Sequence, residues 1–360
     1  MSIETQSPVR TAEEPRSGSI RSQRRLPRLA PLGLYAGGIA LGALLSALSG
    51  FSIVLTVVYG AFLGTLAVYA GSRAVEGRRK ATDRLVTALV TTAFAIAMVP
   101  LVSLVYTVLD KGLARFDSQF FTNSMFRVVG EGGGAYHAIL GTLIITALAA
   151  AISVPIGLLT AIYLVEYGSG RLKKAITFFV DVMTGIPSIV AGLFAFALFT
   201  LIFGGGIRLG VMGAVALSVL MIPVVVRSCE EVLKLVPNEL REAAYALGVP
   251  KWRTVVKVVL PTAIAGLGTG VTLAVARVVG ETAPLLVTVG LITGTNLNPF
   301  DGRMATLPVF AYYQLTQPGV DSQAFLDRAW TAALLLIILV MALNIVARLI
   351  SRFFAPKTGH

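Results

Sequence analysis

The chain has 360 residues, of which 56% are hydrophobic and only 13% are charged, and its mean hydropathy is +0.81. Soluble domains carry about 25% charged residues, so this composition indicates an integral membrane protein. The net charge of +12 does not indicate a nucleic-acid partner, because the basic residues sit in short segments between apolar runs. The single cysteine, Cys229, excludes an intramolecular disulfide, and two histidines without ligand-like spacing argue against a metal site.

The N-terminal part of the chain differs from the rest. Residues 1–30 are rich in Arg, Ser, Pro and Glu, which predicts a disordered cytoplasmic tail. Residues 31–84 contain two apolar runs joined by little more than Ser49 and Gly50, followed by a charged linker, and predict a transmembrane hairpin. The first run begins too late for a cleaved signal peptide and is expected to be retained. Residues 85–350 form the expected working unit, and residues 351–360 form a second cytoplasmic tail.

The apolar runs predict transmembrane helices, since a bilayer core about 30 Å thick is crossed by about 20 residues in a helix. Lipid offers no partners for free backbone groups, and the alternation of a barrel strand is missing, so the expected fold class is an all-α polytopic bundle. Eight segments qualify, namely Leu32–Leu48, Phe51–Gly71, Leu85–Leu109, Ala138–Leu164, Ala175–Phe203, Val211–Val226, Thr262–Pro284 and Ala329–Ile350.

The distribution of basic residues predicts the orientation. With both termini in the cytoplasm, the inner segments hold 23 Lys and Arg residues and the outer segments hold 6. Cytoplasmic loops of membrane proteins carry this excess of positive charge. The same orientation puts residues 236–261 in the cytoplasm. Two outer loops, 110–137 and 285–328, mix aromatic and small polar residues, which suits either a docking surface or anchoring at the membrane interface.

In the fifth span, Gly185, Pro187 and Ser188 predict a break in the helix, because proline removes a backbone donor and restricts the residue before it. Carbonyl groups freed there can line a cavity, although a simple packing kink fits the sequence equally well. Asp181, earlier in the same span, is more consistent with an anchor near the cytoplasmic interface than with a substrate contact.

The seventh span carries two ionisable residues, Arg277 and Glu281, which are four apart and so are expected on one helix face. Charges at membrane depth are costly and by default functional. Arginine offers a planar fork of donors to an oxyanion, and glutamate can accept a bond from a protonated oxygen, which phosphate has at neutral pH and sulfate lacks. The alternative is an internal ion pair that locks helix packing.

Residues 236–261 form a charged segment between the sixth and seventh spans. Asn238 is a predicted N-cap, Gly248 can end the first helix in the left-handed conformation, and Pro250 suits the start of a second helix. Two short helices at an angle present a soluble face to a partner, with Glu242 available to pair with a basic residue. The stretch superficially resembles a DNA-binding helix-turn-helix, but a helix pair tethered at the bilayer is badly placed to enter a major groove.

Several motifs resemble one known family. The spacing of Glu242-Ala243-Ala244, Gly248, Val258 and Leu260-Pro261 is similar to the EAA signature of bacterial ABC importer permeases, with Val258 where Ile is commoner. The stretches ARVVGETAPLL and TGIPSIVAGLFAF resemble segments of the phosphate permeases of the PstA family, and Gly141-Thr142 opens a span as in these permeases. The resemblance covers about residues 85–350.

The resemblance implies a MetI-like core of six helices, with the N-terminal hairpin as an addition, in the cell inner membrane. It implies uptake of phosphate, with molybdate or sulfate as alternatives; an ion-coupled secondary transporter is the rival from another class. The substrate pathway would involve Arg277, Glu281, Thr282, Pro187 and Ser188. Coupling to an ATPase would involve Glu242, Ala243, Ala244, Gly248 and Pro261.

The family also implies the partners of the chain. These are a homologous second permease (PstC-like), two copies of an ATPase subunit (PstB-like) and an extracytoplasmic phosphate-binding protein (PstS-like), together with membrane lipid. The sequence has no GxxxxGK[ST] phosphate loop, so ATP is expected to be used by the partner ATPase. We expect no catalytic residue, metal or cofactor in this chain and no nucleic-acid partner.

Overall fold

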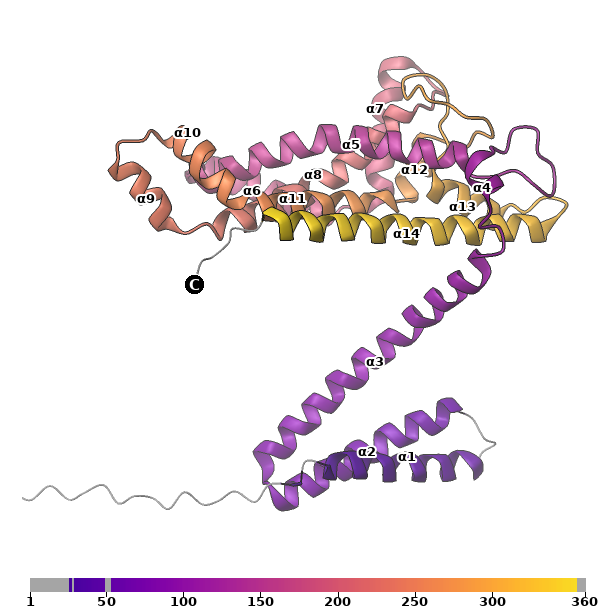
Figure 1. Cartoon of the computed structure of the whole chain (residues 1–360), viewed down its shortest axis with the longest axis vertical. Coiled ribbons are helices and arrows are strands. Elements are labelled where there is room, and N and C mark those ends of the chain that lie inside the picture. Colours follow the sequence, from indigo (N-terminus) through magenta and orange to yellow (C-terminus); the bar gives the residue numbers. More distant parts are fainter. Residues whose placement is uncertain (1–25, 28, 49–52, 355–360) are drawn as a thin grey trace, which may run out of the picture. The chain divides into compact units, whose positions relative to one another are not determined.

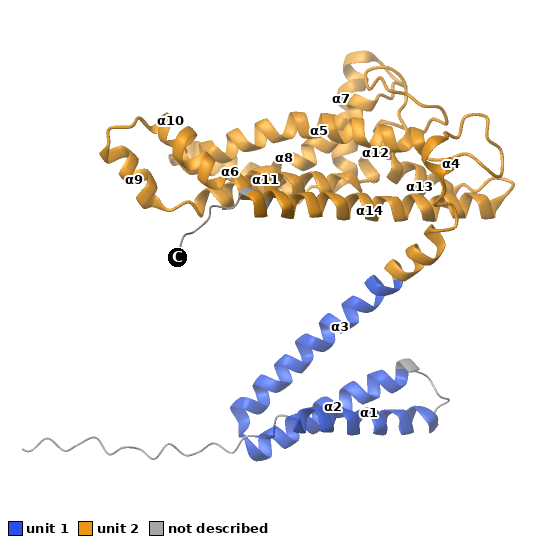
Figure 2. Ribbon diagram, in the orientation of Figure 1, with its two compact units in different colours: residues 1–103 blue, residues 104–360 orange. Residues whose placement is uncertain are grey.

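The computed structural model describes residues 26–27, 29–48 and 53–354, and every regular element within this part of the chain is a helix (Figure 1). The predicted disordered tail, apart from its last residues, lies outside the described residues, as do the Ser49–Gly50 connection and residues 355–360. Two compact units divide the chain, residues 1–103 and residues 104–360 (Figure 2). Helix α3 (Arg78–Gly112) contributes to both units. The predicted domain boundary after residue 84 stays a prediction.

In the first unit, α1 (Ala30–Leu48) and α2 (Ile53–Val75) form the predicted hairpin. Their backbones touch at glycines, because a Cβ added to Gly38 would lie 2.4 Å from the backbone nitrogen of Gly64, and one added to Gly42 would lie 2.5 Å from that of Gly60. Small residues allow this close approach of membrane helices. Any side chain at Gly38 or Gly42 would therefore force the two helices apart.

The second unit is built around one central helix, α8 (Gly210–Lys234), which packs against α5, α6, α7 and α11. Its core is apolar side chains with no exposed surface, such as Met221 and Val225. The other helices are α4 (Ser118–Thr122), α5 (Tyr136–Ile162), α6 (Gly170–Thr184), α7 (Ser188–Phe203), α9 (Asn238–Ala246), α10 (Lys251–Thr254), α11 (Leu260–Val279), α12 (Ala283–Thr288), α13 (Leu307–Thr316) and α14 (Ser322–Phe354).

Two π-helical turns lie near one end of this bundle. The turn η1 (Tyr163–Tyr167) continues α5, and the turn η2 (Val255–Val259) joins α10 to α11. In a π-helical turn the backbone hydrogen bonds join residues five apart, one more than in an α-helix, and such turns are frequent at functional sites. Helix α9 lies at the same end of the bundle, close to α10 (Figure 1).

The described residues contain seven helices long and apolar enough to cross a membrane, or eight spans if the bent pair α6–α7 is counted as one. Most of each predicted segment, in its described part, coincides with one of these helices or with the bent pair, which confirms the predicted membrane bundle. The axes of α6 and α7 differ in direction by 106°. A bend of this size at Pro187 confirms the predicted break and is too sharp for a packing kink.

Three details of the sequence interpretation were wrong. Helix α8 continues to Lys234 rather than stopping at Val226, because alternating charges pair along its last two turns. Helix α11 ends at Val279, where Gly280 forms the C-cap, instead of reaching Pro284. The segment 285–328 is not simply a loop, since it contains α13 and most of α12, and its Phe310 is only 1% exposed.

Candidate functional site

A polar cavity of about 240 Å³ lies in the middle of the second unit, at the break between α6 and α7. Leu220 lies ten residues after the start of α8 and Val224 ten residues before its end, so both are about 15 Å from an end of that helix. The cavity therefore lies about half-way along α8. Its lining comprises Met183, Thr184, Ile186, Ser188, Leu220, Val224, Arg277, Val278 and Glu281.

Arg277 and Glu281 both line this cavity, but they do not share a helix face as predicted. Arg277 lies in the last turn of α11, whereas Glu281 lies beyond the C-cap, with its backbone N–H bonded to the carbonyl of Val278 at 3.1 Å. In the described part of the chain, neither side chain has an ion-pair partner within 4.0 Å. The alternative of an internal ion pair between them is therefore not what the structure contains.

The N-terminus of α7 opens onto the same cavity. Pro187 is the N-cap residue, with φ −56° and ψ 134°, and provides no side-chain cap; the N–H of Val190 donates to its carbonyl at 2.9 Å, whereas the amides of Ser188 and Ile189 keep their capacity to donate. Ser188, the first residue of α7, lines the cavity, whereas Pro187 produces the break without lining it. A helix N-terminus carries partial positive charge and favours an anion.

The chemistry of the cavity suits a small oxyanion. Arg277 and the α7 amides supply donors, Ser188 supplies a hydroxyl, and Glu281 supplies an acceptor. The hydroxyl of Thr184 is already donated to the carbonyl of Asp181 at 2.6 Å. A dianion with one protonated oxygen can use both kinds of group at once, because its charged oxygens accept and its hydroxyl donates.

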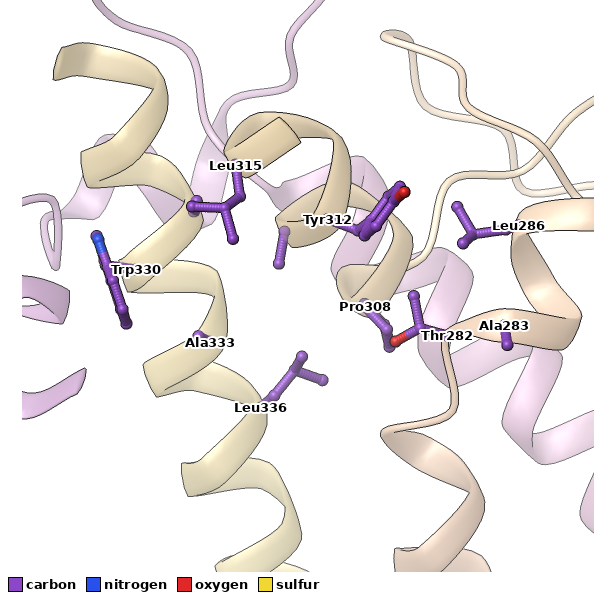
Figure 3. Close-up of a pocket in the computed structure, with 11 residues that line it drawn as sticks. Thr282, Ala283, Leu286, Pro308, Tyr312, Leu315, Trp330, Ala333 and Leu336 are labelled. Carbon is purple, nitrogen blue, oxygen red and sulfur yellow. The ribbon is translucent and has the colours of Figure 1, made fainter. Parts of the chain in front are cut away.

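Thr282, also predicted for the substrate pathway, lies elsewhere. It lines an apolar groove of about 480 Å³ between α12, α13 and α14, and Figure 3 shows its side chain near Pro308, across the groove from Ala333 and Leu336 of α14. The rest of that groove is apolar and aromatic, with Tyr312 facing it from α13. Such a lining offers little to a phosphate group, and Thr282 is thus separated from the cavity of Arg277.

Towards the α9 end, a chain of charged side chains joins α6 to α8. Asp181 pairs with Arg227, whose Nη1 lies 2.7 Å from Glu230 Oε2, and Glu230 Oε1 lies 2.7 Å from Lys234 Nζ. Sequence reasoning named Asp181 but missed Arg227, Glu230 and Lys234, because the apolar run that it used ends at Val226. The spacing of Arg227, Glu230 and Lys234 at i, i+3 and i+7 was the signal that α8 continues as a helix.

The coupling segment, residues 236–261, is built differently from its prediction at two points. The N-cap of α9 is Pro237 rather than Asn238, which is already the first helical residue. The second helix is not a separate short element, because α10, η2 and α11 run on as one span from Lys251. A displacement of α10 is therefore transmitted along this continuous helix to Arg277.

Gly248 ends α9 as predicted, with φ +73°. Its N–H donates to Tyr245 at 2.9 Å, and the N–H of Val249 donates to Ala244 at 3.1 Å. These two bonds define a Schellman motif, which needs the left-handed residue that glycine supplies without a Cβ penalty.

The exposed surface of the coupling segment is accessible to a partner. Glu242 and Ala243 are exposed, whereas Ala244 is 7% exposed and packs inward, and Pro261 is exposed in the first turn of α11. In the described residues Glu242 has no ion-pair partner. The coupling segment and the residue before it also carry large apolar side chains that are at least 40% exposed, namely Leu235, Leu240, Tyr245, Leu247 and Trp252.

Arg241, which sequence reasoning did not single out, fixes α9 to the bundle. Its Nη2 donates to Glu166 Oε1 of η1 at 2.8 Å and to the carbonyl of Leu233 at 3.1 Å, and its Nη1 donates to the carbonyl of Val236 at 2.6 Å. The side chains of Arg241 and Glu166 are 12% and 4% exposed. No sequence signal links them, because they are 75 residues apart.

A second contact joins the same π-helical turn to α10. The Nζ atom of Lys251 lies 5.1 Å from the centroid of the Tyr167 ring. The turn η1 is thus held by α9 through Glu166 and by α10 through Tyr167. Through η1, both α9 and α10 are thereby joined to the end of α5.

Comparisons with known proteins agree with this architecture. A family described as "Binding-protein-dependent transport system inner membrane component" matches residues 153–360. The phosphate transport system permease protein PstA 1 of Mycobacterium tuberculosis (strain H37Rv) is 48% identical over 78% of this chain and 90% of its own length. PstA of Pasteurella multocida is 37% identical over 78% of this chain and 97% of its own.

A solved bacterial alginate ABC transporter shares the fold, with a TM-score of 0.54 and 15% identity over 78% of this chain and 97% of the matched one. With seven helices in its described part long and apolar enough to cross a membrane, the chain is a multi-pass inner membrane protein. It belongs to the binding-protein-dependent permeases of ABC transporters, among the relatives named PstA.

Proposed function

We propose that this chain is the permease subunit of a phosphate ABC importer and forms half of the pathway for inorganic phosphate. The observation that carries the proposal is Arg277, which lines a cavity half-way along α8 and has no ion-pair partner among the described residues. A charge kept there without a partner is costly unless a ligand supplies one. The relatives with 37–48% identity are named as phosphate permeases, which supports the same substrate.

Glu281 supports phosphate over sulfate. Its carboxylate lines the cavity that Arg277 also faces, so an incoming dianion must tolerate a nearby negative charge. Phosphate carries a proton at neutral pH and can donate it to the carboxylate, whereas sulfate has no proton and meets only repulsion. Molybdate resembles sulfate in this respect.

Energy enters through the coupling segment, which we place in the cytoplasm together with both termini. Its exposed apolar side chains and Glu242, which has no ion pair in the part of the chain that the structure describes, form a surface for an ATPase subunit that binds and hydrolyses ATP. Arg241 passes the movement to η1 and α5, and α10 passes it to α11. The chain itself carries out no covalent chemistry and needs no cofactor.

The complete importer would contain a homologous second permease, two ATPase copies and an extracytoplasmic phosphate-binding protein. Phosphate would cross between the two permeases, with the Arg277 cavity opening to each side in turn. The residues that we assign to this path are Arg277, Glu281 and Ser188, with Pro187 providing the break in the helix.

The main test is uptake of labelled phosphate by proteoliposomes that contain the assembled complex, its binding protein and ATP. Replacing Arg277 with Ala should lower uptake roughly thirtyfold or more, since removing one partner of a desolvated charge pair costs about 2–5 kcal/mol. Arg127→Ala is the matched control, because Arg127 is exposed and lies over Phe126 outside the cavity. Equal uptake in the two variants would remove Arg277 from the pathway.

Selectivity tests the role of Glu281 separately. In Glu281→Gln, competition by sulfate should become stronger relative to the parent complex, because the repulsive carboxylate is replaced by a neutral amide. An unchanged sulfate inhibition constant would show that Glu281 does not discriminate between the two oxyanions.

Coupling is tested by Glu242→Ala, which removes an exposed charge without burying anything. The variant should insert and assemble with its partner permease, yet lose ATP-dependent uptake. Phosphate uptake at the parental rate would disconnect this surface from the ATPase.

A further inference from the structure

A second cleft, of about 710 Å³, lies at the other end of α8 and carries two arginines that the transport pathway does not use. It is formed by the last turns of α7, the connection to α8 and the segment 300–303, and its basic residues are Arg208 and Arg303. Arg208 precedes α8 by two residues, so the cleft lies at the end of the unit opposite the coupling segment. About 15 Å of helix separate it from Leu220 at the Arg277 cavity.

The two arginine side chains converge on one glycine. A Cβ added to Gly290, whose φ is +70°, would lie 3.1 Å from Cδ and 3.2 Å from Nη1 of Arg208, and 3.4 Å from Cδ of Arg303. Both arginines line one cleft, where their like charges repel each other and an anion between them relieves the repulsion. In the described residues neither guanidinium has an ion pair or a side-chain hydrogen bond, although Asp301 lines the same cleft.

The loop that carries Arg303 is held in place by its own hydrogen bonds. The side-chain amide of Asn296 donates to the carbonyls of Asp301 at 2.7 Å and Arg303 at 2.9 Å. The N–H of Val211, in the first turn of α8, donates to the carbonyl of Pro299 at 2.8 Å. The two arginines therefore project from backbone fixed to the start of α8, and a ligand need not order the loop first.

We propose that Arg208 and Arg303 form a binding site for a phosphate group at this end of the bundle. With the orientation of the proposed importer, which this inference relies on, the site faces the outer side and receives the anion before it enters the Arg277 cavity. A guanidinium group donates two parallel hydrogen bonds to phosphate oxygens, and two guanidinium groups neutralise a dianion. The phosphate group is either free inorganic phosphate or the headgroup of a phospholipid.

The test measures phosphate binding at this cleft without a contribution from the Arg277 cavity. The assembled complex, purified in a phosphate-free maltoside detergent, carries Arg277→Gln in every sample, and binding of labelled inorganic phosphate is measured together with phospholipid retained in native mass spectra. Arg208→Gln combined with Arg303→Gln should weaken phosphate binding roughly tenfold or more, since hydrogen bonds to charged groups contribute about 1.5–3 kcal/mol. Arg127→Gln is the matched control for loss of one outer charge.

Asp301→Asn provides a variant that should act in the opposite direction. Removing the carboxylate from the cleft should strengthen phosphate binding a few-fold, because the anion no longer meets a like charge. If the arginines instead served to neutralise Asp301, this variant would weaken binding or assembly, and the proposal would be wrong.

The outcomes separate the sources of the phosphate group. Loss of inorganic phosphate from the double variant identifies free phosphate as the ligand, whereas loss of copurifying phospholipid alone identifies a headgroup. If neither phosphate binding nor phospholipid retention differs from that of Arg127→Gln, the site does not exist. The site is also excluded if the double variant loses only docking of the binding protein. Failure of the proposed phosphate import would appear independently, as absence of phosphate uptake by the complex without substitutions.

Discussion

The guanidinium groups of Arg241, in the coupling segment, and of Arg277, in the central cavity, have opposite environments. Arg241 donates to a carboxylate and to backbone carbonyls and is 12% exposed on its side chain. Arg277 is exposed to its cavity and has no ion pair in the described part of the chain. A charge whose donors are all used holds helices together, whereas a charge whose donors are free is available to a ligand.

The same difference separates Glu166 from Glu281. Glu166 is buried in η1 and receives two donors of Arg241, while Glu281 faces the cavity without an ion-pair partner in the described residues. Matched substitutions at the two places should therefore affect different properties. Those at the coupling end should lower the stability of the fold, and those in the cavity should alter transport alone.

The largest effect is expected for Arg241→Ala. It leaves the carboxylate of Glu166 buried without a partner, and breaking a buried pair in this way costs about 3–5 kcal/mol. Unfolding by sodium dodecyl sulfate in mixed micelles, followed by circular dichroism, measures the loss. Arg277→Ala is the control, with an expected change below about 1 kcal/mol. Equal destabilisation by both would contradict the distinction between a structural and a ligand-binding arginine.

Glu166→Gln should have a smaller effect, because the amide oxygen still accepts a hydrogen bond from Arg241 while the charge is lost. We expect the free energy of unfolding to fall by about 1.5–3 kcal/mol, the range for hydrogen bonds to charged groups. Glu281→Gln, measured in the same way, should leave stability within about 0.5 kcal/mol of the parent. A loss of stability in Glu281→Gln would mean that its carboxylate has a structural partner after all.

Gly248→Ala tests the turn at the end of α9. Alanine at φ +73° meets the steric penalty of the left-handed region, about 1–2 kcal/mol. Gly280 is the matched position, since it also caps a helix but has φ −88° and no atom within 4 Å of an added Cβ. Gly280→Ala should therefore be neutral or stabilise by up to about 1 kcal/mol. Similar melting temperatures for the two variants would show that the turn at Gly248 rearranges freely.

The sequence was sufficient to predict the membrane helices and the coupling segment. Apolar runs, the proline in the fifth span and the glycine at 248 are local signals, and each acts through the backbone within a few residues. Local signals also brought Arg277, Glu281 and Ser188 to attention, and the structure brings these three around one cavity. Whether substrate passes there stays a prediction.

The remaining errors have a common physical cause, which is that partners distant in the sequence are invisible to local patterns. The pair of Arg241 and Glu166 joins residues 75 positions apart. Arg328, in the predicted outer loop 285–328, is 0% exposed in α14 and donates to the carbonyls of Gly130 and Gly132. Such tertiary partners let a helix keep charges that composition alone would place in a loop.

The smallest expected effect concerns Lys251, the second contact between the coupling segment and η1. Lys251→Gln removes the cation over Tyr167, and a double-mutant cycle with Tyr167→Leu should give a coupling energy of about 0.5–1 kcal/mol. Arg253, on the same short helix but over Trp252, should show no coupling to Tyr167. If Lys251 also shows none, Arg241 carries the connection between the coupling segment and η1.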